Sequence, residues 1–187
     1  VLLPENFAFI GPEDEKIALA ETIPGGGRVL ATLTTLAREH RIYLVGGGMP
    51  EKTNTQERVH NACVLVAPDG SVAAVYRKMH LFDVEIAGAI SFKESRTVAP
   101  GAEPVVAELP FGRLGLSVCY DLRFPELYRA LSAAGATMLA IPSAFTMYTG
   151  KDHWHVLVRA RAIENLAYVL APAQSGAHNR ERSSYGK

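Results

Sequence analysis

The chain has 187 residues, 48% of them hydrophobic, and its 19 basic residues balance 19 acidic ones. A chain of this size typically buries about 70% of its unfolded surface in a core. The balanced charge argues against nucleic acid or an anionic membrane as the main partner, and no apolar run reaches the ~20 residues of a membrane-spanning helix. We therefore expect one globular domain that binds neither nucleic acid nor a membrane.

Strand-like and helix-like segments alternate along the chain, which predicts a single α/β layered domain. Gly46–Gly48 closes a strand without the helix that a dinucleotide-binding loop needs, so we interpret it as turn backbone. No periodicity holds over 79–101, and its aromatic residues favour an ordered, functional loop. The expected strands are 1–5, 41–48, 61–67, 71–78, 104–109, 113–118, 136–144 and 168–176, and the expected helices are 27–40, 125–135 and 153–167.

The two cysteines occupy different contexts. Cys63 lies inside an apolar run and is expected to be a small buried hydrophobe. Cys119 lies where an apolar strand stops, before a helix that begins near Pro125. A tight turn there would expose the sulfur, and the positive end of the helix would favour the thiolate.

So few cysteines favour a reducing, cytoplasmic compartment and argue against a disulfide framework. No Cys/His cluster has zinc-ligand spacing, and His153 and His155 would point to different faces of a helix. We therefore expect neither a metal nor a cofactor.

Three chemically distinct side chains each follow an apolar segment: Glu5, Lys78 and Cys119. Strand ends are where layered α/β folds place their sites, so the three could converge at one rim of a sheet. A carboxylate can take the proton of an attacking thiol, and a lysine can stabilise the oxyanion that forms. The backbone N–H of Tyr120 would add a second donor. This combination predicts acyl transfer through a thioester.

The segments around these three residues resemble the signature blocks of the nitrilase superfamily of carbon–nitrogen hydrolases. The blocks are "LPENFAF", "YRKMHLFDVEI" and "SVCYDLRFPEL", and they occur in the family's order. Residues 149–186 resemble the Nit branch, and within it the deaminated glutathione amidases. The resemblance implies a four-layer α-β-β-α sandwich of the nitrilase type, with Glu5 as general base, Lys78 as oxyanion stabiliser and Cys119 as nucleophile.

The resemblance also implies a fourth catalytic residue and a substrate class. The family's second glutamate, which positions the lysine, corresponds to Glu94 in "SFKES". Tyr120, Arg123 and Tyr148 are candidate substrate contacts, because family pockets draw on the loops after these strands. The implied enzyme is a hydrolase that cleaves a small carboxylated amide, releases ammonia and works as a homodimer or larger homo-oligomer.

Two kinds of alternative stay open. The first three blocks are shared between branches, so an ω-amidase or an N-carbamoyl amidase is possible. A non-catalytic binding or assembly protein could use the same fold, although the intact set of Glu5, Lys78 and Cys119 speaks against it. Because family members begin a strand earlier and continue further, we expect 1–187 to be one hydrolase domain truncated at both ends, without its first strand and C-terminal portion.

Overall fold

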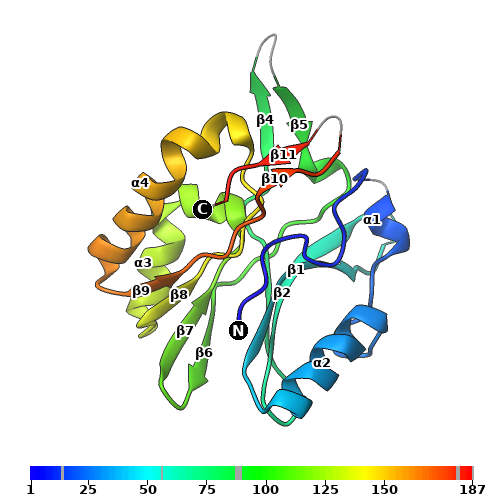
Figure 1. Ribbon diagram of the computed structural model, residues 1–187, viewed down its shortest axis with the longest axis vertical. Coiled ribbons are helices and arrows are strands. Elements are labelled where there is room, and N and C mark those ends of the chain that lie inside the picture. The colour runs from blue at the N-terminus through cyan, green and yellow to red at the C-terminus, as the bar shows by residue number, and fades with distance from the viewer. Residues whose placement is uncertain (14, 56, 87–89, 180–181, 187) are drawn as a thin grey trace.

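Two β-sheets packed face to face form the centre of the fold, and helices cover their outer faces (Figure 1). The structure, a computed structural model, describes residues 1–13, 15–55, 57–86, 90–179 and 182–186. One sheet has the order β1–β2–β3 and is antiparallel. The other has the order β6–β7–β8–β9, in which β6 is antiparallel to β7 and the last three strands are parallel. The fold is therefore mixed α/β, as expected.

The elements follow the predicted alternation over most of the chain. The predicted first strand is reduced to one bridge, between Leu2 and Val45. The helices are α1 (Glu15–Ala18), α2 (Arg28–His40), α3 (Pro125–Ala133) and α4 (Met147–Asn165), with 3-10 helices η1 (Glu94–Arg96) and η2 (Cys119–Arg123). The strands are β1 (Leu44–Lys52), β2 (Val59–Val66), β3 (Val72–Arg77), β4 (Asp83–Ile86), β5 (Ile90–Lys93), β6 (Val105–Leu109), β7 (Gly112–Leu116), β8 (Met138–Ala140), β9 (Tyr168–Leu170), β10 (Gly176–Ala177) and β11 (Ser183–Ser184).

The apolar run of β2 lies between two layers of the core. Ala62 and Val64 belong to the cluster that α2 covers, whereas Cys63 and Leu65 belong to the cluster between the two sheets. Successive side chains of a strand point to opposite faces, so a strand buried on both faces needs an unbroken apolar run. Cys63 is fully buried, which confirms the prediction that it is a core residue.

The segment 79–101, predicted to be a loop without periodicity, contains a hairpin. Strands β4 and β5 pair Val84 with Phe92, and Ser95 binds the Asp83 carboxylate through its N–H and hydroxyl at 2.9 and 2.6 Å. Each strand has only four residues, so the alternation is too short to be recognised as a strand pattern. The prediction of an irregular loop was wrong over these strands, although the ordered character that we expected is present.

Helix α4 begins at Met147, before the predicted start at 153. Its first turns contain Thr149 and Gly150, which have low helix propensity. The sequence therefore does not predict a helix over these turns. Packing explains the glycine, since a Cβ at residue 150 would lie 2.5 Å from the Cβ of Tyr185. Within the described part of the chain, none of the helices has the length and apolar character needed to cross a bilayer.

Candidate active site

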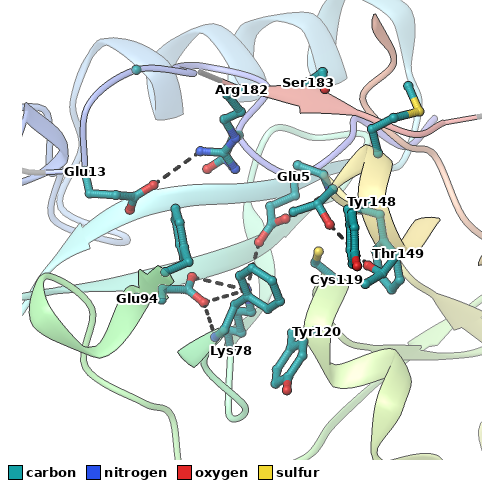
Figure 2. Close-up of a pocket in the computed structure, with 18 of the residues that line it drawn as sticks. Glu5, Glu13, Lys78, Glu94, Cys119, Tyr120, Tyr148, Thr149, Arg182 and Ser183 are labelled. Atoms are coloured by element: carbon teal, nitrogen blue, oxygen red, sulfur yellow. Dashed lines mark hydrogen bonds and ion pairs between the residues drawn. The ribbon is translucent and has the colours of Figure 1, made fainter. Parts of the chain in front are cut away.

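A cavity of about 530 Å³ brings together every residue that the sequence singled out for the site. The N-terminal segment, the β4–β5 hairpin, η2, the start of α4 and β11 contribute to its walls. Figure 2 shows the polar side chains of these elements facing one another across it. The predicted residues that line the cavity are Glu5, Lys78, Glu94, Cys119, Tyr120, Arg123 and Tyr148.

The Lys78 ammonium lies between two carboxylates at the base of the cavity. Its Nζ donates to Glu5 Oε1 at 3.0 Å and to the two oxygens of Glu94 at 3.1 and 2.9 Å (Figure 2). All three side chains are at least 95% buried. Charges this deeply buried are tolerated only when they are paired and hydrogen-bonded, and this group meets both conditions.

A third buried side chain, Asn61, links the two carboxylates. Its Nδ2 donates to Glu5 Oε1 at 3.0 Å and to Glu94 Oε1 at 3.5 Å. Backbone groups complete the set, because the N–H of Ala144 donates to Glu5 Oε2 at 3.0 Å and the N–H of Phe82 to Glu94 Oε2 at 2.7 Å. These donors fix the orientation of both carboxylates. Asn61 is a polar residue at the start of an apolar run, and no sequence pattern marked it as part of the site.

The glycines at 46–48 allow the segment that carries Glu5 to approach β1. They lie within β1, at an irregularity in its pairing with β2, so the interpretation as turn backbone was wrong. A Cβ on Gly47 would collide with the carbonyl oxygen of Leu3 and with the ring of Pro142. A Cβ on Gly48 would lie 3.2 Å from Glu5 Cγ. The close approach of the two backbones explains why this strand contains consecutive glycines.

Cys119 has an unusual backbone conformation at the start of η2. Its φ is +48°, in the left-handed region that a residue with a Cβ rarely adopts, and its N–H donates to the carbonyl of Pro142 at 2.9 Å. Strained backbone of this kind is concentrated at functional sites. The Glu5 carboxylate interacts with this thiol and is the acceptor available for its proton.

The turn after Cys119 is braced by Asp121, which is fully buried. Its carboxylate accepts from the N–H of Val118 at 2.8 Å, from the Tyr76 hydroxyl at 2.7 Å and from the N–H of His80 at 3.0 Å. The ring of His80 also lies beside this carboxylate, with Nδ1 2.7 Å from Oδ1. This bracing holds the strained turn in place.

The site holds its charge on Glu5 and Lys78 rather than on the thiol. Burial and the Glu5 carboxylate raise the pKa of the Cys119 thiol well above its ordinary 9.0. Burial alone would also raise the pKa of Glu5, but the Lys78 ammonium and a hydrogen bond from Cys119 hold it below its ordinary 4.5. Burial opposes the charge on Lys78, yet the two carboxylates hold its pKa well above 10.5.

The resting site therefore contains a neutral thiol beside an ionised carboxylate. This overturns our expectation that the positive end of a helix favours the thiolate. Cys119 is the first residue of the 3-10 helix η2, and the α-helix α3 begins only at Pro125.

The three candidate substrate contacts also line the cavity. Tyr120 makes an edge-on contact with Phe82, with ring centroids 5.0 Å apart. The Arg123 guanidinium lies 5.2 Å from the centroid of Phe145 and has no carboxylate partner among the described ion pairs. Tyr148, in the first turn of α4, is 56% exposed. All three are accessible from the cavity, so their contact with substrate stays a prediction.

Another charged group on the cavity wall was missed by the sequence analysis. Glu13 accepts a hydrogen bond from Lys16 Nζ at 2.7 Å and from Arg182 Nη1 at 3.3 Å. Glu13 and Arg182 lie on irregular segments 169 residues apart, and Lys16 lies in the short helix α1, so no local pattern could have joined Arg182 to the other two. Among the described residues, no group of three or more His, Cys, Asp and Glu side chains is arranged to hold a metal ion.

Comparisons with known proteins agree with this geometry. The family model described as carbon-nitrogen hydrolase matches residues 1–187. Deaminated glutathione amidases from Synechocystis and from human are each 48% identical to the chain, over 98% of its length. The crystal structure of the NitFhit protein of Caenorhabditis elegans superposes with a TM-score of 0.90, at 46% identity over 100% of the chain.

The chain spans only part of each of these proteins. It covers 68% of the Synechocystis amidase, 57% of the human amidase and 45% of the NitFhit chain. The family match nevertheless runs through every described element, from the segment that carries Glu5 to the strand β11. On the evidence of that match and of these relatives, the chain belongs to the carbon–nitrogen hydrolase family, the nitrilase superfamily that its motifs resemble.

Proposed function

We propose that the protein is a thiol amidohydrolase that cleaves a small carboxylated amide through a thioester on Cys119. The observation that carries this proposal is the buried cluster at the base of the cavity. It places a neutral thiol against an ionised carboxylate, and a lysine ammonium beside both. A protein that only bound a partner would have no need of this costly group of buried charges.

In the first half of the reaction, the Glu5 carboxylate takes the thiol proton as the sulfur attacks the carbonyl carbon of the amide. The carbonyl electron pair moves to oxygen, and the Lys78 ammonium and the backbone N–H of Tyr120 stabilise the oxyanion. The tetrahedral intermediate then collapses, the carbon–nitrogen bond breaks, and Glu5 gives its proton to the leaving nitrogen. The products are a thioester and free ammonia or, from an N-substituted amide, a free amine.

In the second half, water replaces the nitrogen. Glu5, again a carboxylate, takes a proton from a water molecule as its oxygen attacks the thioester carbon. Lys78 and Tyr120 stabilise the second oxyanion in the same way. The carbon–sulfur bond breaks, and the thiolate recovers a proton from Glu5, which restores the resting site. A low pKa on Glu5 keeps it ready as a base, since it is ionised at neutral pH.

Glu94 acts as a positioning residue in this scheme. It accepts two hydrogen bonds from Lys78, so the ammonium is held in place while Glu5 gains and loses a proton. If Glu5 were the only partner, each protonation of its carboxyl would release the lysine. The second carboxylate therefore keeps the oxyanion donor fixed throughout the cycle.

The relatives support a specific substrate class. Several are named deaminated glutathione amidases, and their similarity extends over nearly the whole chain. We propose that this protein likewise acts on deaminated glutathione or a similar carboxylated amide. Arg123 is suited to bind a substrate carboxylate, since it lines the cavity with no carboxylate partner among the described ion pairs. Tyr120 and Tyr148 would contact the rest of the substrate.

We further propose that residues 1–187 form a single domain with the four-layer α-β-β-α sandwich of the nitrilase type. Its layers would be α2, the two sheets, and α3 with α4. A homodimer or larger homo-oligomer is supported by large exposed apolar side chains on and just after α4, among them Val156, Ile163 and Tyr168. A cytoplasmic location is supported by the two free cysteines.

The test of the proposed function compares the two cysteines. Cys119→Ala should abolish hydrolysis of deaminated glutathione while the protein stays folded. Cys63→Ala should keep its activity and lose about 1 kcal/mol of stability or less, because it removes one small buried atom. Mass spectrometry of the wild-type protein during turnover should detect an acyl adduct on Cys119. Loss of activity in Cys63→Ala but not in Cys119→Ala would show that the nucleophile is misassigned.

A further inference from the structure

The cavity contains a second charged group that the proposed reaction does not use. Lys16 and Arg182 both line the cavity and share the single carboxylate of Glu13. Two positive charges against one negative charge give this group a formal charge of +1. In Figure 2 the side chain of Glu5 lies between the Glu13–Arg182 pair and the sulfur of Cys119. The group is therefore separate from the cluster around Lys78, but faces the same space.

The described residues do not fill the hydrogen-bonding capacity of this group. Lys16 is only 6% exposed, and within the described chain its ammonium donates to Glu13 alone, although it carries three N–H donors. With the residues that the structure describes, the Arg182 side chain makes one hydrogen bond, at 3.3 Å, although its guanidinium carries five N–H donors. A buried cation with free donors is stabilised by an anion that enters the cavity, and a carboxylate suits both side chains.

The geometry indicates which half of the substrate carries that carboxylate. In the proposed reaction Glu5 gives a proton to the leaving nitrogen, so the amine half must lie on the Glu5 side of Cys119. Lys16 is near enough to Glu5 for its charge to help lower the pKa of that carboxyl. Arg123, by contrast, lies in η2, the helix that begins with Cys119. The acyl half would face Arg123, and the amine half would face Lys16 and Arg182.

We propose that Lys16 and Arg182 form a subsite for a carboxylate on the amine half of the substrate. This inference rests on the proposed amidase function and narrows its substrate class. The preferred substrates would be N-substituted amides whose amine half is an amino acid or short peptide with a free carboxylate. A primary amide, which releases only ammonia, would leave this subsite empty.

The test uses a matched pair of substrates. One is deaminated glutathione, whose cysteinylglycine half ends in a carboxylate, and the other is the same compound with that carboxylate converted to a carboxamide. We expect Lys16→Gln and Arg182→Gln each to lower kcat/KM for the acid about 10- to 100-fold, mainly through KM, since a hydrogen bond to a charged group is lost. On the carboxamide both variants should stay within about twofold of wild type.

Three controls make the outcome decisive. Arg28→Gln and Lys52→Gln each remove an exposed positive charge outside the cavity and should leave both substrates unaffected. Arg182→Lys keeps the charge and should retain most of the preference for the acid. Circular dichroism of each variant should show that it is folded.

Each remaining outcome has a definite meaning. If the variants lose activity equally on both substrates, or lose none, the subsite does not exist. If the wild type hydrolyses both substrates equally well, the inference fails while the proposed function stands. If it hydrolyses neither, the proposed function fails and the inference fails with it.

Discussion

A Glu94→Gln substitution replaces one oxygen of a buried carboxylate with an NH2 group and keeps the shape of the side chain. Glu94 accepts four hydrogen bonds, two from Lys78 and one each from Asn61 and the N–H of Phe82. All of these partners are donors. Whichever way the glutamine amide turns, its NH2 group would face Lys78 together with either Asn61 or Phe82. The substitution therefore removes a charge and also creates an unavoidable donor–donor contact.

The expected cost follows from these contacts. Breaking a buried ion pair by removing one partner typically costs about 3–5 kcal/mol. Lys78 would keep its hydrogen bond to Glu5 at 3.0 Å, so we expect a smaller loss of about 2–4 kcal/mol in the free energy of unfolding. A lysine that is no longer held from both sides would misplace the oxyanion donor, and small misplacements of this kind lower turnover about 10²-fold.

The assay separates positioning from the reactivity of the thiol. Turnover of deaminated glutathione, urea unfolding and alkylation of Cys119 by iodoacetamide are measured on the same preparations. Glu94→Gln should lose turnover while Cys119 is still alkylated at a similar rate, because Glu5 remains as base. Glu5→Gln should slow both reactions. Glu103→Gln, an exposed glutamate, is the control. If Glu94→Gln has the stability and turnover of the wild type, Glu94 is an ordinary carboxylate and the reasoning is refuted.

Three other perturbations have expected outcomes. Lys78→Arg should lower turnover by about 10²-fold or more, because a planar guanidinium cannot replace a compact ammonium between two carboxylates; turnover within a few-fold of wild type would remove Lys78 from the mechanism. Alkylation of Cys119 should keep accelerating above pH 9, since its raised pKa delays formation of the thiolate, and a plateau below pH 8 would contradict that direction. Gly47→Ala should destabilise the protein by about 1–3 kcal/mol and lower turnover, because a Cβ there displaces the segment that carries Glu5; unfolding and kinetic data like those of the wild type would show that the segment adapts.

The residues at strand ends were the part of the site that could be predicted from sequence. Glu5, Lys78 and Cys119 each interrupt an apolar pattern, and the structure brings all three to one cavity. Glu94 had no such signal, because the strand β5 before it is too short to be recognised, and it was found only through the family resemblance. Its place beside Lys78 agrees with that expectation.

Other parts of the site depend on packing that no local pattern records. Asn61 follows His60 at the start of a strand whose remaining residues are buried and apolar, so nothing marks it as a link between Glu5 and Glu94. The expectation that a helix terminus favours the thiolate of Cys119 was wrong for the same reason, whereas a carboxylate that takes the thiol proton was expected. The protonation state depends on how deeply the thiol is buried and on which charge lies next to it, and both are set by the tertiary structure.

The hydrogen bonds of Glu5 have a consequence for how this protein is made. Its carboxylate is held by the N–H of Ala144 and its carbonyl by the amide of Gln174, across sequence separations of 139 and 169 residues. Contacts this distant form late, because the loops that they close are long. In a nascent chain whose residues 144 and 174 are still inside the ribosome, Glu5 would not yet be held in place. Cys119 would then lack its general base. Turnover would thus begin only after residues 144 and 174 have left the ribosome and packed against Glu5, so the appearance of activity during synthesis would report the formation of these contacts.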